Sequence, residues 1–241
     1  MLPLFAQSEL RDLIEKVEQG ERLDFEAGVR LMKSNDILAL GYMANLVRER
    51  KNGDQTYFIV NRNRDDKSVS VDMEVTQRLG ETTNASMVYG QSETVEERVN
   101  QLFQLRKLQD EHGRFLTFIP LPYYPEDTKL EGNMGVESST GFEDLRMVAV
   151  SRILLDNFDH IKAFWIMFGP KLAQVSLKFG VDDLDGTVAE DRIMDAAGVE
   201  PEQVMLKRSL IKMIHKAGRH AIERDTLYQV IVDYGCKEGQ D

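Results

Sequence analysis

Helical periodicity dominates the first 55 residues of the chain. Apolar residues recur three and four positions apart, a spacing that places them on one face of a helix, and it predicts helices over 9–19, 25–32 and 36–51. An Asn-Gly turn signal follows, and β-branched and aromatic residues then predict a strand over 56–60. The expected caps are polar residues just ahead of each helix: Ser8, Asp24, and either Ser34 or Asn35.

A polar and charged stretch interrupts this pattern at 62–75. Apolar and polar positions alternate only weakly there, after Lys67, and the pattern favours a loop. We therefore treat 62–75 as an atypical junction that follows an N-terminal segment of helices and one strand, 1–61.

Strand-like and helix-like segments alternate between residues 82 and 187. Thr94 and Glu97 form a capping box, which predicts the start of an amphipathic helix. The predicted strands are 82–90, 115–122, 161–168 and 181–187, and the predicted helices begin near Thr94, Phe142 and Pro170. Strands and helices in this order are typical of parallel strands joined by right-handed crossovers, so the fold class is α/β.

The α/β part has the length of about half a barrel. A complete (β/α)8 barrel needs about 250 residues, or roughly 31 per unit, whereas residues 71–187 number 117. An open layer of about four parallel strands leaves two edges that other elements or a partner must cover. We predict an incomplete (β/α) barrel of about four βα units over 76–189. A C-terminal helical extension over 190–241 is expected to contain helices at 190–197 and 201–217.

Charge and cysteine content exclude several classes of function. The 241 residues carry 30 Lys and Arg against 41 Asp and Glu, a formal net charge of −11, and phosphate backbones repel such a chain, so no nucleic-acid partner is expected. The single cysteine, Cys236, excludes an internal disulfide and favours a cytoplasmic location. No apolar run reaches the roughly 18 residues of a membrane span, so no membrane partner is expected. The start of the chain lacks the basic region of a secretory signal.

Three stretches of the chain resemble one enzyme family. EKVEQGERLDFEAGVRLMKSNDILALGYMANLVRER with YFIVNRN is similar to the opening of the radical SAM enzymes of the futalosine route to menaquinone. NASMVYGQSETVEERVNQLFQLRKLQDEHGRFLTFIPLPYYPEDTKL is similar to a later barrel segment of that group. DLRMVAVSRILLDNFDHIKAFWIMFGPKLAQVSLKFGVDDLDGTVAEDRI and the closing GRHAIERDTLY resemble the aminofutalosine synthases more than the dehypoxanthine futalosine cyclases.

The resemblance implies a barrel of the radical SAM type and a transferase activity. Such enzymes join the 5′-deoxyadenosyl group of S-adenosylmethionine to a small molecule, 3-[(1-carboxyvinyl)oxy]benzoate, with loss of CO2. The cofactors that the resemblance implies are S-adenosylmethionine and a 4Fe-4S cluster.

The cluster-binding part of the family pattern is missing from this chain. In the family, the strand that corresponds to 57–61 leads towards a CxxxCxxC loop, whose three thiolates hold the cluster. This chain has the junction there and no cysteine before Cys236. We therefore expect no cluster, and no cluster-dependent activity, from this chain alone. The alternative is a non-catalytic truncated relative that binds a partner or self-associates through exposed barrel edges.

The first candidate site follows the strand over 82–90. Gly90-x-x-Glu93 resembles the family's adenine-side G-x-x-E motif, at the end of a strand where α/β sites lie. A tight turn with a carboxylate at a helix start is an equal alternative. Family members commonly have His in place of Gln91 and Tyr124, and these departures weaken a catalytic role.

The second candidate site is the acidic end of the strand over 181–187. Asp182, Asp183 and Asp185, with Thr187, can hold substrate hydroxyls or a cation, or can cap the following helix. By resemblance this group lines the substrate end of the barrel. A metal hydrolase built on the three carboxylates is a further alternative, although the four histidines lack metal-ligand spacing.

Three further residues complete the candidate set. Arg224 can pair with a substrate carboxylate or form a structural salt bridge, and Asn84 and Tyr89 either line a cavity or pack in the core. The candidate substrate- or cofactor-binding residues are Asn84, Tyr89, Gly90, Glu93, Asp183, Asp185, Thr187 and Arg224. No metal ligand is predicted.

Overall fold

The N-terminal helices form as their periodicity predicts. The computed structural model describes residues 3–60, 83–123, 139–186, 188–189 and 205–235. A 3-10 turn, η1 (Pro3–Phe5), precedes α1 (Arg11–Gln19), α2 (Phe25–Lys33), α3 (Ile37–Asn52) and β1 (Gln55–Phe58). Asp24 caps α2 by accepting from the Ala27 amide at 2.9 Å. The cap of α3 is Asp36, which accepts from the Ala39 amide at 3.0 Å, rather than Ser34 or Asn35.

The strand–helix alternation is confirmed in the central part of the chain. Its elements are β2 (Thr83–Tyr89), α4 (Val95–His112), β3 (Phe115–Pro122), α5 (Gly141–Leu154), β4 (His160–Phe164), α6 (Trp165–Ser176) and β5 (Asp183–Asp185). The capping box at the start of α4 is present, with the Thr94 side chain accepting from the Glu97 amide. The strand predicted over 161–168 ends early, because α6 already begins at Trp165. Periodicity does not separate a strand from a helix in a continuous apolar run.

The strands form a seven-stranded sheet in the order β2-β3-β4-β5-β1-β8-β9. All neighbours pair in parallel except β8 (His220–Arg224) and β9 (Val230–Asp233), which pair antiparallel. Short strands β6 (Val188–Ala189) and β7 (Met205–Leu206) form a separate parallel pair, and α7 (Lys207–Lys216) precedes β8. The expected α/β fold with neighbouring parallel strands is confirmed by this topology.

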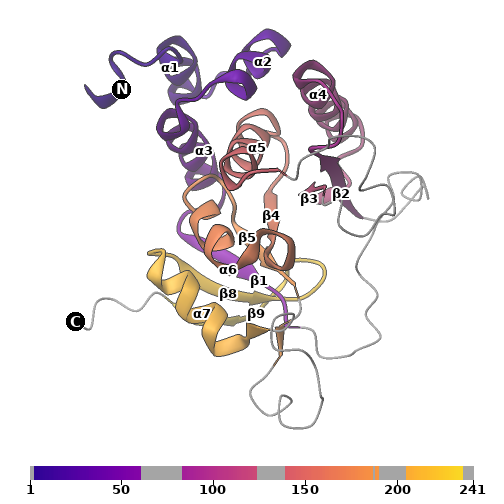
Figure 1. Ribbon diagram of the computed structural model, residues 1–241. Coiled ribbons are helices and arrows are strands. Elements are labelled where there is room, and N and C mark those ends of the chain that lie inside the picture. The colour runs from indigo at the N-terminus through magenta and orange to yellow at the C-terminus, as the bar shows by residue number, and fades with distance from the viewer. Residues whose placement is uncertain (1–2, 61–82, 124–138, 187, 190–204, 236–241) are drawn as a thin grey trace, which may run out of the picture.

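Beyond the helices expected in the C-terminal extension, residues 220–233 form the strands β8 and β9. The β8 strand pairs along its length with β1 and is buried at four of its five positions. Pairing with β1 therefore favours a strand at residues 220–224, whereas the residues before them form the helix α7. Strand β1 pairs with β5 on one side and β8 on the other, so both ends of the chain contribute to the sheet (Figure 1). The junction at 62–75 and the helix expected at 190–197 lie outside the described residues.

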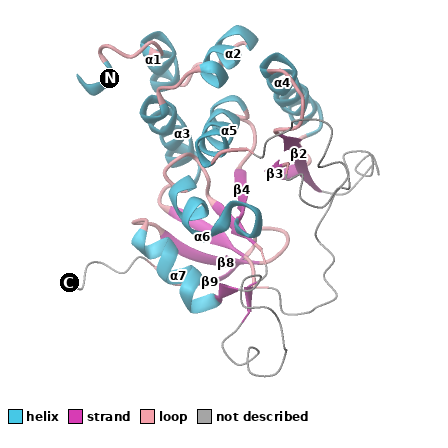
Figure 2. Ribbon diagram, in the orientation of Figure 1, coloured by secondary structure: helices cyan, strands magenta, loops and turns pink. Residues whose placement is uncertain are grey.

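Helices cover one face of this sheet, which we call the outer face. Ala85, Met87 and Tyr89 of β2 lie there and are buried in the main hydrophobic core. Because side chains alternate along a strand, Asn84, Ser86 and Val88 lie on the opposite, inner face. Figure 2 shows α4 close to β2, α5 close to β4, and α7 beside β8 and β9. The inner face is the side of the sheet without α4 and α5, and the site lies there.

Candidate functional site

Polar side chains from several strands gather on the inner face. Pairing register places Lys162 of β4 beside Asp183 of β5, and Asp183 beside Tyr57 of β1. Paired residues of neighbouring strands point to the same side of a sheet, so these side chains share the inner face. We call the whole group the inner-face site: Tyr57, His160, Lys162, Asp183, Asp185, Arg224 and Tyr228.

Asp183 and Arg224 form a buried ion pair in this site. The Nη2 of Arg224 lies 2.6 Å from Oδ2 of Asp183, and the two residues are 2% and 0% exposed respectively. Burial opposes the charge of Arg224, but the Asp183 carboxylate outweighs burial and raises the pKa of Arg224. Asp183 Oδ1 and Arg224 Nε are buried and have no hydrogen-bond partner among the described residues. One acceptor and one donor of this ion pair therefore remain without a hydrogen bond, and a polar ligand could bind to them.

Asp185 pairs with a different cation. Its Oδ2 lies 2.6 Å from Nζ of Lys162, and its Oδ1 accepts from the Gly186 amide at 2.7 Å. Lys162 is itself buried and also lies 3.8 Å from Asp183. Over the described ranges, no group of three His, Cys, Asp or Glu side chains is arranged to hold a metal ion. Thr187 lies outside the described residues.

Asp182 holds His160 in a fixed orientation. Its Oδ2 lies 2.6 Å from Nδ1 of His160, and its Oδ1 accepts from the Ile161 amide at 2.8 Å and from Arg152. Arg152 is fully buried, and burial lowers its pKa. A carboxylate on Nδ1 fixes the imidazole ring and directs Nε2 away from that carboxylate. The hypothesis that Asp182 caps a following helix is therefore replaced by a role in a buried network.

Tyr228 reaches the site from the turn between β8 and β9. Its hydroxyl donates to Asp183 Oδ2, and its ring stacks on His160 with centroids 3.8 Å apart and planes 3° apart. Burial raises the pKa of Tyr228 well above its ordinary value. Neither His160 nor Tyr228 was among the residues expected from sequence. His160 and Lys162 are alternate polar residues in an otherwise apolar strand, and this pattern is the signal in the sequence that could have identified them as site residues.

Gly90 and Glu93 form a closed turn at the end of β2. Glu93 accepts from the Gly90 amide at 2.6 Å and from the Gln91 amide at 2.9 Å, and Arg98 donates to it at 2.6 Å. Burial alone would raise the pKa of Glu93, but these hydrogen bonds lower it overall. Gly90 has a φ of 88°, which favours glycine. Both carboxylate oxygens are engaged within the protein, which favours the turn over a cofactor contact.

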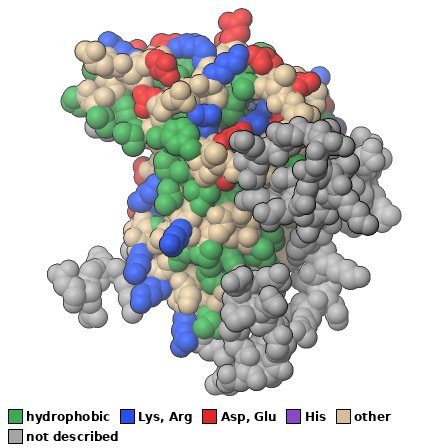
Figure 3. Space-filling view, in the orientation of Figure 1, with side chains coloured by type: hydrophobic (Ala, Val, Ile, Leu, Met, Phe, Trp, Pro, Cys, Tyr) green, Lys and Arg blue, Asp and Glu red, His purple; other side chains and the backbone are tan. Residues whose placement is uncertain are grey.

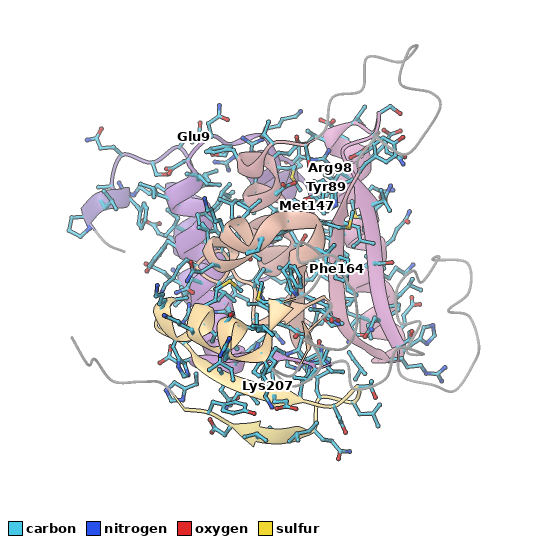
Figure 4. All side chains as sticks on the ribbon, turned by 60° about the horizontal axis from the view of Figure 1, so that its bottom comes forward. Glu9, Tyr89, Arg98, Met147, Phe164 and Lys207 are labelled. Atoms are coloured by element: carbon cyan, nitrogen blue, oxygen red, sulfur yellow. The ribbon has the colours of Figure 1, made fainter. Side chains whose placement is uncertain are left out.

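Tyr89 and Asn84 lie on opposite faces of β2. Tyr89 is 0% exposed, and its hydroxyl donates to Asp144 of α5 at 2.6 Å. Figure 4 shows Tyr89 and Arg98 together beside Met147 of α5, and Arg98 lies 5.5 Å from the Tyr89 ring centroid. Asn84 is half-buried on the inner face, in register with Thr117. The geometry therefore assigns Tyr89 to packing and leaves Asn84 near the site.

Asp144, beneath Tyr89, is expected to make stability depend on pH. Burial raises its pKa above the ordinary value of 3.8, so ionisation disfavours the folded state. Stability is then highest below that ordinary pKa and falls as pH rises through the folded-state pKa. We expect Asp144→Asn, whose amide oxygen still accepts from Tyr89, to raise the free energy of unfolding at pH 7 by about 1 kcal/mol. Urea unfolding between pH 4 and 8 should show this gain widening with pH.

Asp12 supplies the matched control for that measurement. A hydrogen bond from Arg30 lowers its pKa, so Asp12→Asn should instead cost stability across this pH range, because that contribution is present above the ordinary pKa of 3.8 and is lost only at lower pH. A gain from Asp144→Asn that stays constant across the pH range would contradict the assignment of its cause to ionisation.

A 4Fe-4S cluster does not fit the residues of this chain. Such a cluster is held by several thiolates, whereas the chain has one cysteine, Cys236, which lies outside the described residues.

The fold and site together define a partial α/β barrel with a polar site on its inner face. The family described as the CofH/MqnC C-terminal region matches residues 111–234, which is more than half of the chain, and the chain belongs to this family.

Known proteins extend this family assignment. The chain is 49% identical over 154 residues to the aminodeoxyfutalosine synthase of Thermus thermophilus, and the match covers 64% of this chain and 41% of that enzyme. It is 40% identical over 158 residues to a 5-amino-6-(D-ribitylamino)uracil–L-tyrosine 4-hydroxyphenyl transferase of Methanosarcina mazei, again covering 64% of this chain and 41% of the relative. The chain thus spans about two fifths of the length of these relatives.

A solved structure supports the fold alone. The FeFe-hydrogenase maturase HydG of Carboxydothermus hydrogenoformans superposes with a TM-score of 0.60 at 11% identity, covering 92% of this chain and 81% of that one. In the part of the chain that the structure describes, no helix is long and apolar enough to cross a membrane. Figure 3 shows mixed acidic and basic side chains over the N-terminal helices.

Proposed function

We propose that this chain is the substrate-end half of an aminofutalosine synthase-type radical SAM transferase. The reaction is the joining of the deoxyadenosyl group of S-adenosylmethionine to 3-[(1-carboxyvinyl)oxy]benzoate, as the family resemblance implies. The observation that carries the proposal is the 49% identity to the Thermus aminodeoxyfutalosine synthase. The inner-face site supports it, because buried Asp183 and Arg224 each retain an unpartnered polar atom.

The chain alone is proposed to be inactive in this reaction. Its single cysteine leaves it without the thiolate set that a cluster requires. This chain would contribute the residues that bind the substrate. Asp185 holds Lys162 in place, and Asp183 holds Arg224 in place. The test is to insert the missing barrel units of the Thermus relative between β1 and β2, and to assay the deoxyadenosyl adduct and CO2 release from substrate and S-adenosylmethionine under anaerobic conditions with a one-electron reductant.

A second candidate function is self-association without catalysis. All four residues of β9 are exposed, including Val230 at 57% and Ile231 at 46%, and β9 is an edge of the seven-stranded sheet. An exposed apolar edge strand is a ready surface for pairing with another strand. The occupant we propose is β9 of a second copy, because a twofold axis pairs one edge with its own equivalent.

Light scattering over a range of concentrations tests this second function. We expect a dimer mass that falls towards the monomer on dilution, and a monomer at every concentration for Ile231→Lys, because a charge on an edge strand opposes strand pairing. Asp233→Lys, at the end of the same strand, should also weaken the dimer, whereas the exposed control Leu4→Lys on η1 should not. A monomer mass for the unaltered chain at all concentrations would exclude self-association.

A further inference from the structure

Two helices on one side of the molecule carry basic residues and no acidic ones. The stretches 165–180 and 205–222, which contain α6 and α7, hold seven Lys and Arg and no Asp or Glu, although the whole chain has a net charge of −11. The two helices are in contact, because the Gln174 side chain of α6 donates to the Met213 carbonyl of α7 at 2.9 Å. Figure 3 shows basic side chains over the region where α6 and α7 lie in Figure 1. This acidic chain therefore presents one surface on which the charged residues are basic.

We call the exposed part of this surface the basic strip. It consists of four exposed lysines: Lys171, Lys178, Lys212 and Lys216. None of their ammonium groups forms a hydrogen bond or an ion pair with another residue that the structure describes. Elsewhere an exposed lysine such as Lys33 pairs within the chain, with Glu96 at 2.6 Å. Lys207, at the start of α7, pairs with Glu223 of β8 at 2.6 Å and is not part of the strip. The strip thus keeps four ammonium groups available to an external partner.

The strip has a regular spacing and one exposed apolar side chain. Lys212 and Lys216 lie one turn apart on α7, which is about 6 Å along the helix axis. Lys171 and Val175 are likewise one turn apart on α6, and the Lys178 amide donates to the Val175 carbonyl at 2.9 Å, so Lys178 continues that face. Val175 is 44% exposed. The strip therefore combines ammonium groups with an apolar contact, as protein interfaces do.

Two buried arginines lie behind Lys178. Arg219 is 2% exposed and donates to the carbonyl of Leu177, the residue before Lys178, at 3.1 Å. Arg48 is 0% exposed and shares the acceptor Asn45 Oδ1 with Arg219. Burial, followed by the charges of Arg219 and Arg48, lowers the pKa of Lys178, and nearby carboxylates compensate only in part. A carboxylate from outside the chain would relieve this repulsion, so an acidic partner is favoured at this end of the strip.

Two other classes of anionic partner fit this surface less well. A helix that binds a membrane inserts an apolar face into the lipid, whereas the apolar residues Leu210 and Ile214 of α7 are fully buried in the core. An extended nucleic acid is repelled by a chain with a net charge of −11. An acidic protein segment can contact the strip alone, and it can supply an apolar side chain for Val175.

We propose that the basic strip docks an acidic segment of a partner protein, with carboxylates about 6 Å apart against the lysines and an apolar side chain against Val175. Carboxylates have this spacing on successive turns of a helix and on alternate residues of an extended chain. Salt should weaken the association, because the charges meet at an exposed surface. The strip shares no residue with the inner-face site, so this inference goes beyond the proposed transferase function and is tested independently of it.

The probe is a labelled helical peptide that repeats Glu-Ala-Leu-Ala, and fluorescence anisotropy measures its binding to the full chain. We expect saturable binding at about 20 mM salt, and binding at least about tenfold weaker at about 200 mM salt. Lys212→Glu combined with Lys216→Glu should weaken the binding at low salt at least about tenfold, because it replaces attraction with repulsion. A peptide that repeats Glu-Ala-Ala-Ala should bind about fivefold more weakly, because it lacks the apolar side chain that contacts Val175.

The control is Lys16→Glu combined with Lys107→Glu, which changes the net charge equally at exposed positions of α1 and α4. It should leave the affinity within about twofold of that of the unaltered chain. Absence of binding, equal losses for the two pairs of substitutions, or equal binding of the two acidic peptides would overturn the proposal. Tighter binding of phosphatidylserine vesicles or of single-stranded DNA would also overturn it.

A milder pair of substitutions covers the case in which circular dichroism shows that the strip variant does not fold. Lys212→Gln combined with Lys216→Gln should then weaken the binding at least about threefold. A folded Gln pair that binds the peptide as tightly as the unaltered chain overturns the proposal.

Discussion

Insertion of the missing barrel units is expected to convert an inactive chain into an active transferase. The inserted segment is that of the Thermus relative between the strands equivalent to β1 (Gln55–Phe58) and β2 (Thr83–Tyr89). By family resemblance this segment carries the three-cysteine loop. Strand β1 pairs with β5 and β8, so the insertion should leave its pairing in place. After anaerobic reconstitution with iron and sulfide, and with a one-electron reductant and substrate present, we expect cluster absorption, the deoxyadenosyl adduct and CO2 release from the extended chain, and none of these from the unaltered one.

Two variants of the extended chain give this experiment its controls. Replacement of the three inserted cysteines by alanine should abolish both the absorption and the activity. Arg224→Gln should retain the absorption but lower kcat/KM by about 100-fold, because it removes the cation that is hydrogen-bonded to the buried carboxylate of Asp183. Cluster formation and deoxyadenosine release by the unaltered chain would overturn the proposal that it is inactive alone.

Local signals predicted most helix starts and strands of this fold. Asp24 and Thr94 cap helices where the sequence pattern expects them, because an N-cap depends on residues within a few positions of itself. The C-terminal strand β8 was less accessible to such reasoning. Its identity as a strand depends on pairing with β1, which lies 165 positions away at the His220–Gln55 pair. Periodicity within a five-residue segment carries no information about such a partner.

The residues of the candidate site were also predicted only in part. Asp183 and Arg224 were both expected from the family resemblance, and the structure brings them into one ion pair across 41 positions of sequence. For Tyr89 the sequence left packing and cavity lining open, and its alternate position on β2 turns it to the outer face, where it packs. Tyr228 escaped prediction because its place depends on a turn that folds back over three strands.

Loss of Arg152 is expected to have the largest effect on stability of any single change considered. Arg152 and Asp182 are both 0% exposed, and the guanidinium also donates to the Gly180 carbonyl at 2.8 Å and the Asp159 carbonyl at 3.2 Å. Removing one partner of a buried ion pair leaves the other charge uncompensated and costs about 3–5 kcal/mol. The free energy of unfolding of a domain is about 5–15 kcal/mol. Arg152→Met should therefore remove a large part of it, as measured by urea unfolding.

The exposed pair of Arg11 and Glu15 provides the comparison. Their side chains are 58% and 45% exposed, so Arg11→Met should cost less than about 1 kcal/mol. Adding Asp182→Leu to Arg152→Met removes the stranded charge and should recover part of the loss, although the Ile161 amide and His160 then lose their acceptor. If the free energy of unfolding of Arg152→Met lies within about 1 kcal/mol of that of the unaltered chain, the buried network does not hold His160 and β5 in place as the geometry indicates.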